Sequence, residues 1–138
     1  MRVTIDANAL FAALIRGGLA RRIIFISGAE LFAPAFLIDE FQKYRGLKLR
    51  KFGGSSKSFS SLEGKIFKYI RIIPDSELVP FLEAAKTLTK DEKDIYYFAC
   101  ALKEGTAIWS SDLGMRAQRR IKTLSTEEMA KACGLLRK

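Results

Sequence analysis

Two acidic residues follow short apolar segments that have the composition of buried β-strands. Asp6 comes directly after residues 3–5 in VTID, and Asp112 comes shortly after residues 107–109 in AIWSSD. In an open parallel sheet, the carboxyl ends of the strands lie at one edge, and ligands bind there. We therefore expect these two carboxylates to lie at the same edge of one sheet.

A third acid falls on the buried side of a predicted helix at about residues 36–51. With about 100° of rotation per residue, Glu40 lies within the apolar arc that includes Leu37 and Phe41. Its neighbour Asp39 lies on the polar side of the same helix. An acid in the middle of an apolar arc has no capping role, so Glu40 is the hardest of the acids to explain structurally.

A second predicted helix, at about residues 92–104, brings two more acids. Asp91 and Asp94 share the inward side in KDEKDIYYFACAL. By the same rotation, Glu92 and Lys93 point elsewhere. No lysine or arginine is expected on the inward faces, and burying several carboxylates without a basic partner is costly. A bound divalent cation is the natural compensation.

The chain of 138 residues contains no histidine and only two cysteines, Cys100 and Cys133, which we interpret as packing residues. This composition excludes histidine-based nucleophile systems and makes a zinc site unfavourable. Carboxylate oxygens suit Mg²⁺ or Mn²⁺, which can polarise a phosphodiester and lower the pKa of a bound water. The metal-binding and catalytic candidates are Asp6, Glu40, Asp94 and Asp112, with Asp91 as an additional acid.

Each aspartate also has a purely structural interpretation. Asp6 can cap the helix that follows it, and Asp91 and Asp94 can stabilise the N-terminus of theirs. Asp112 can be an ordinary turn residue. A shared site is favoured because four of the six aspartates in the chain occupy these positions.

Positive charge is concentrated between residues 43 and 71, where nine basic residues face a single acid, Glu63; the whole chain carries a net charge of +9. Such an excess favours a polyanionic partner. The same excess of basic residues also fits a solvated helix face. The aromatic residues interleaved with them suit either stacking on bases or packing in a core. The candidate nucleic-acid contacts are Lys43, Arg45, Lys48, Arg50, Lys51, Lys57, Lys65 and Lys68.

Strands and helices that alternate along the chain would position these acidic and basic residues. Strands are predicted near residues 3–5, 30–33, 69–73, 107–109 and 121–124, and helices near 9–16, 18–27, 36–51, 56–68, 76–87, 92–104 and 126–133. Ser76 is a plausible N-cap, and Ser125 opens a capping box. The pattern predicts one α/β domain over residues 1–138 with a mainly parallel sheet. Without a membrane span or signal peptide, a cytoplasmic protein is expected.

The four acids in this order and spacing resemble a PIN domain over nearly the whole chain. The resemblance implies a three-layer α/β/α fold with about five strands. It also implies a ribonuclease that depends on Mg²⁺ or Mn²⁺. By the same resemblance, Asn8 would support Asp6, Ser110 would hydrogen-bond in the outer shell of the metal, and Asp91 would be an extra acid.

Many PIN domains are toxins of the VapC type, so the resemblance also implies a homodimer and a small antitoxin partner. The basic helical pair at about 36–68 would be an insertion or clamp, richer in charge than a minimal toxin requires, which favours a different RNA target or an RNA-processing role. The main alternative is a catalytically silent PIN-like module that binds RNA or protein. A DNA nuclease stays open, whereas a phosphatase with an aspartyl nucleophile is disfavoured because position 8 is Asn.

Overall fold

The computed structural model describes residues 1–137. Over this range a single sheet contains five parallel strands in the order β3-β2-β1-β4-β5. The strands are β1 (Arg2–Ile5), β2 (Glu30–Pro34), β3 (Ile70–Ile73), β4 (Ala107–Trp109) and β5 (Thr123–Leu124). The strand order reverses direction between β1 and β4, and in sheets of this kind a ligand crevice opens at that point.

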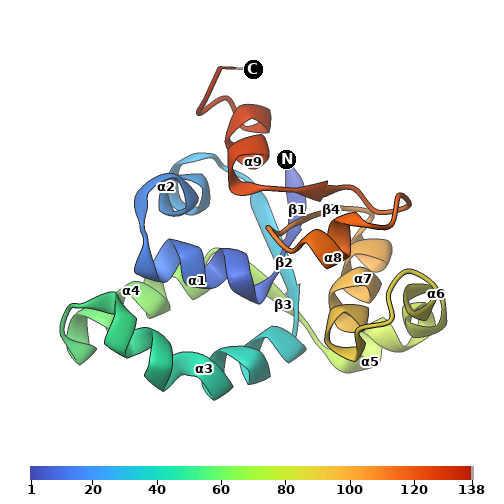
Figure 1. Ribbon diagram of the computed structural model, residues 1–138, viewed down its shortest axis with the longest axis horizontal. Coiled ribbons are helices and arrows are strands. Elements are labelled where there is room, and N and C mark those ends of the chain that lie inside the picture. The colour runs from blue at the N-terminus through green and yellow to red at the C-terminus, as the bar shows by residue number, and fades with distance from the viewer. Residues whose placement is uncertain (138) are drawn as a thin grey trace.

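Helices cover both faces of the sheet, which gives three layers (Figure 1). On one side lie α1 (Ala7–Ile15), α2 (Gly18–Ile26), α3 (Phe36–Phe52) and α4 (Ser56–Phe67). On the other side lie α5 (Asp75–Leu78), α6 (Leu82–Lys86) and α7 (Glu92–Glu104). The α/β fold predicted from the sequence is therefore the fold observed. Among the helices of residues 1–137, none combines the length and apolar character needed to cross a membrane.

The prediction of one continuous helix at 76–87 was wrong. The chain forms α5, a 3₁₀ turn at Val79–Phe81 and then α6, and Pro74 rather than Ser76 is the residue that precedes the first helical turn. Pro80 explains the break, because proline donates no backbone hydrogen bond and clashes with the preceding turn. A four-residue helix, α8 (Leu113–Arg116), was not predicted. The capping box of Ser125 is present at α9 (Thr126–Ala132).

The aromatic residues of the basic segment belong mainly to the core between α3 and α4. Phe59 is fully buried and packs edge-to-face against Phe52, while Phe67 packs in the same way against Phe41. Tyr69 is exposed, with its ring against Phe25. Of the two interpretations of these aromatics, core packing therefore holds for the three phenylalanines.

Candidate active site

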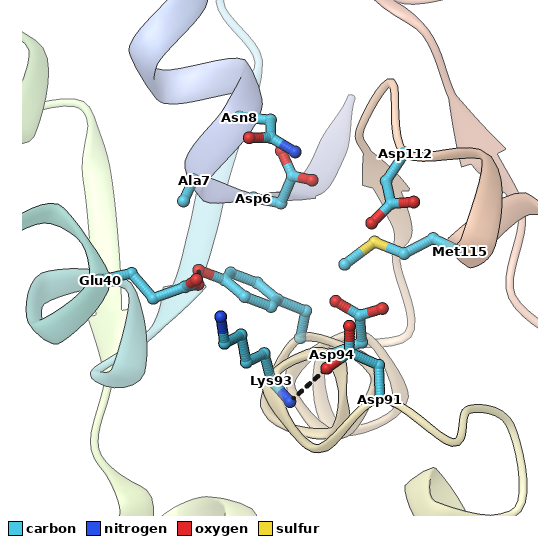
Figure 2. Close-up of a pocket in the computed structure, with 10 residues that line it drawn as sticks. Asp6, Ala7, Asn8, Glu40, Asp91, Lys93, Asp94, Asp112 and Met115 are labelled. Atoms are coloured by element: carbon cyan, nitrogen blue, oxygen red, sulfur yellow. Dashed lines mark hydrogen bonds between the residues drawn. The ribbon is translucent and has the colours of Figure 1, made fainter. Parts of the chain in front are cut away.

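A pocket of about 170 Å³ lies at the carboxyl ends of β1 and β4, and five acidic side chains line it (Figure 2). The acids come from four separate parts of the chain: the end of β1, α3, the start of α7 and the β4–α8 loop. They are Asp6, Glu40, Asp91, Asp94 and Asp112. The crevice at the reversal of strand order is thus a pocket in which five carboxylates meet.

Asp6 combines a structural role with a place in the pocket. Its carboxylate accepts a hydrogen bond from the Ala9 N–H at 2.9 Å, which caps α1, and its own N–H donates to the Trp109 carbonyl at 3.2 Å. The residue is only 3 % exposed. Burial raises the pKa of Asp6 to about 6, although the Ser110 hydroxyl and the Ala9 N–H oppose the rise. A carboxylate is therefore held where ionisation is unfavourable.

Asp91 and Asp112 also cap helices from the edge of the pocket. Asp91 accepts from the Lys93 N–H at 2.9 Å, and Asp112 accepts from the Gly114 N–H at 2.8 Å. Both bonds use Oδ1, so capping occupies one oxygen of each carboxylate. The second oxygen of each carboxylate therefore remains available for a metal. The N-termini of α1, α7 and α8 all lie at this pocket.

Glu40 is held in place by a tyrosine on the facing helix. The Tyr97 hydroxyl donates a 2.5 Å hydrogen bond to Glu40 Oε1 and so joins α7 to α3. Tyr97 is 2 % exposed, and burial followed by the nearby Glu40 raises its pKa well above the usual range. Tyr97 was not predicted as a site residue, although its position three residues after Asp94 places it on the same face of α7.

Asp94 is the acid most strongly affected by the others. It is 8 % exposed, and its pKa is raised to about 7 by burial first and then by the charges of Asp91, Asp112, Asp6 and Glu40. Within residues 1–137, none of the five acids forms an ion pair with a lysine or arginine within 4 Å. Within the described range, no ion pair therefore neutralises the carboxylates of the pocket.

One cation does line the pocket. Lys93, on the first turn of α7, extends its side chain toward Glu40 (Figure 2). The expectation that Lys93 points elsewhere was wrong. Helical angles describe where Cβ points, whereas the flexible stem of lysine carries the ammonium group several ångströms to one side.

The supporting residues lie close to the acids. Asn8 lines the pocket beside Asp6, but across residues 1–137 no hydrogen bond joins the two side chains (Figure 2). Ser110 is fully buried, and its hydroxyl accepts the Asp112 N–H at 3.0 Å. Ser110 thus lies between Asp6 and Asp112 and orders the loop that carries the second of them.

The chemistry of the pocket fits a hard divalent cation. Its donors are oxygens, their charges are unpaired and two of their pKa values are raised by crowding and burial. Within the described range, no three of these carboxylates are already positioned to hold an ion together. Binding would therefore require the side chains to turn inward around the metal.

The basic residues divide into groups. Lys48 and Lys51 line a groove beside the pocket, and Lys43 lines a hollow that also contains Glu40. Arg45 pairs with Glu63 at 2.7 Å and donates to Ser60, so it joins α3 to α4. The remaining candidates are exposed residues of α3, α4 and the segment before β3; they are Arg50, Lys57, Lys65 and Lys68.

The raised pKa of Asp6 predicts a pH-dependent stability. A carboxyl that binds its proton more tightly in the folded state lowers the free energy of unfolding as pH rises from about 4 to about 6. Asn also caps helices, so Asp6→Asn should raise the stability of the metal-free protein at pH 8 by on the order of 1–3 kcal/mol, with little gain at pH 4. Thermal unfolding in EDTA at both pH values measures this. Asp39→Asn, an exposed acid, is the control; equal melting temperatures for Asp6→Asn and the parent at pH 8 would contradict it.

Comparison with known proteins agrees with this geometry. A PIN domain family model matches residues 4–133. No curated protein sequence matches the chain significantly. Among solved structures, a chain of the VapBC2 complex from Rickettsia felis, bound to a DNA fragment from their promoter, is similar with a TM-score of 0.68. That match covers 91% of this chain and 98% of the other at 10% identity, which shows a shared fold. The resemblance inferred from the four acids is confirmed: the chain belongs to the PIN domain family.

Proposed function

We propose that the protein is an endoribonuclease that depends on Mg²⁺ or Mn²⁺. The observation that carries this proposal is the pocket of five carboxylates without a basic ion-pair partner among residues 1–137, placed at the reversal point of the sheet. Membership of the PIN domain family, which includes nucleases, supports it. The charge and placement of Lys43, Lys48 and Lys51 support a polyanionic substrate.

The residues would divide the work as follows. Asp6, Glu40, Asp94 and Asp112 would hold one or two ions, with Asp91 at the rim. When bound there, the metal would supply positive charge that polarises the phosphodiester. The same charge would lower the pKa of water, so that hydroxide is available to attack the phosphorus. Hydrolysis forms one bond from the water oxygen to phosphorus and breaks the bond to the leaving oxygen.

Other side chains would orient these groups. The Tyr97 hydroxyl fixes one Glu40 oxygen and leaves the other free to turn toward the pocket. Ser110 steadies the loop of Asp112. Lys93 would meet the negative charge that develops on the phosphate, because its side chain extends into the same pocket.

We further propose that this nuclease is the toxin of a toxin–antitoxin pair, as a homodimer with an antitoxin partner. The support is family membership together with a fold shared with a chain of a VapBC2 complex. A catalytically silent RNA- or protein-binding module is the competing proposal. The observation that favours it is that no three carboxylates of residues 1–137 are already grouped around one point.

A cleavage assay separates the two proposals. Labelled single-stranded RNA, structured RNA and single-stranded DNA are incubated with the protein in Mn²⁺ or in EDTA. We expect cleavage of RNA that EDTA abolishes, because the carboxylates alone cannot activate water at the phosphodiester.

Neighbouring residues on α3 provide a matched pair of variants. Glu40→Gln should lower the cleavage rate by at least about 10-fold, since Glu40 lines the pocket, whereas exposed Asp39→Asn should leave it unchanged. Salt-sensitive RNA binding with no cleavage in any metal would favour the silent module. Cleavage that persists in EDTA would contradict metal dependence.

A further inference from the structure

A second concave surface opens directly beside the acid pocket. This groove of about 270 Å³ runs between α1 and α3, which pack side by side (Figure 1). Asn8 lines both the groove and the acid pocket, so the two are adjacent. A ligand lying in the groove would therefore lie next to the residues of the acid pocket.

The groove is lined by positive charge, whereas acids predominate among the charged residues of the pocket. Its charged residues are Arg16 on α1 and Lys48 and Lys51 on α3, and no acid lines it. Within residues 1–137 none of the three forms an ion pair. Three uncompensated cations in a concave surface attract a polyanion.

Local structure explains why Arg16 is free for this role. α1 ends at Ile15, after which Gly17 takes a positive φ of 65° that only glycine adopts readily. The carbonyls of Ala13 and Leu14 in the last turn accept hydrogen bonds from Arg21 at 3.0 and 3.1 Å. The end of α1 is therefore satisfied by another arginine, and Arg16 lies exposed at the groove.

α3 aligns the two lysines with the pocket. At about 100° per residue, Lys51 lies about 20° from Glu40 around the helix axis and Lys48 about 80° from it. Lys48 is already held in place, with its Nζ 5.0 Å from the centre of the Phe11 ring. The same side of one helix thus carries an acid of the pocket and the cations of the groove.

The groove offers no free aromatic face for a base. Phe11 is 5 % exposed and stacks on Phe41 with ring centroids 5.4 Å apart, so its faces are occupied by Phe41 and the Lys48 ammonium. Single-strand binding proteins that stack bases use exposed aromatic side chains. The groove is therefore suited to a phosphate backbone.

We infer that the groove between α1 and α3 holds the backbone of a single-stranded RNA as it enters the acid pocket, with Arg16, Lys48 and Lys51 as its phosphate contacts. This inference rests on the proposed nuclease function. It adds Arg16, which the charge pattern of the sequence did not single out. It also assigns the contacts to three residues that flank the catalytic pocket.

The test measures RNA binding in EDTA, so that its outcome is independent of cleavage. Replacing Arg16, Lys48 and Lys51 with Gln should weaken binding of a labelled RNA by at least about 10-fold and reduce the slope of log affinity against log salt by about 2. Poly-U and poly-A oligonucleotides should lose affinity equally, because phosphate contacts carry no sequence information.

Two further variants control for folding and for net charge. Arg16→Gln/Lys51→Gln changes only exposed residues and should lower the slope by about 1.4 without changing the melting temperature. Arg22→Gln/Lys122→Gln removes the same charge at exposed positions outside the groove and the pocket. Its affinity should stay within about twofold of the parent, as expected for charges that contact no phosphate.

The outcomes separate this inference from the nuclease proposal. Equal losses in the Arg16/Lys51 and Arg22/Lys122 variants would overturn the inference, even if the parent cleaves RNA. Binding of a glutamate-rich peptide with no binding of RNA would also overturn it, in favour of a protein partner. In the cleavage assay, the groove variants should raise KM and leave kcat largely unchanged; an unchanged KM would contradict the assigned path.

Discussion

Replacing Asp94 with Asn should abolish metal-dependent cleavage, with a loss in kcat of about 100-fold or more. The charge of Asp94 interacts with all the other acids of the pocket, since burial first and then each of the other four acids raise its pKa. Asn has nearly the same shape but neither the charge nor the second anionic oxygen, so the pocket would hold a divalent ion poorly. Single-turnover cleavage in Mn²⁺ measures the effect.

RNA binding distinguishes a chemical loss from a folding defect. The Asp94→Asn protein should bind RNA in EDTA as well as the parent or better, because a charge that repels phosphate is removed. Glu92→Gln is the matched control on the same helical turn, exposed and outside the pocket, and should cleave normally. Cleavage by Asp94→Asn at the parental rate would remove Asp94 from the proposed site.

Millimolar Mg²⁺ or Mn²⁺ should raise the melting temperature of the parent protein. Without metal, ionised Asp6 and Asp94 are destabilising, and an ion that binds only the folded state adds a linkage energy of about 2.7 kcal/mol at 100 times its dissociation constant. The stabilisation should grow from pH 5 to pH 8, since protons and metal compete for the same carboxyls. Thermal unfolding against metal concentration measures it.

Screening by salt must be separated from specific binding. A NaCl series at matched ionic strength should produce a much smaller shift, because screening reduces repulsion without coordinating oxygens. The double variant Asp6→Asn/Asp94→Asn should show no response to the divalent ion beyond that of NaCl. A parent protein whose melting temperature is insensitive to both divalent ions would argue against a shared site.

Periodic patterns in the sequence were enough to predict the sheet and to place the acids. Asp6 and Asp112 follow neighbouring parallel strands, so the geometry of any such sheet places them at one edge. Glu40 follows from the rotation of α3, where Asp39 is exposed and Glu40 turns inward. These predictions depend only on backbone geometry, which local sequence specifies well.

Features that depend on long side chains or on distant partners were not predictable. The entry of Lys93 into the pocket depends on its rotamer, and the bond from Tyr97 to Glu40 depends on how α7 packs against α3. The charge count could not separate Arg45, which pairs with Glu63 eighteen residues later, from Lys48 and Lys51. Only tertiary packing decides which cations are free.

The continuity of α3 connects recognition to chemistry. Glu40 and Lys51 lie eleven residues apart on one unbroken helix, a rise of about 16 Å. On the proposed path, the length of α3 between these residues sets the distance from the phosphate contact at Lys51 to the phosphodiester bond that is cleaved. Fragments too short to span that distance would be held at one end alone, so the enzyme would favour long strands and release its own short products.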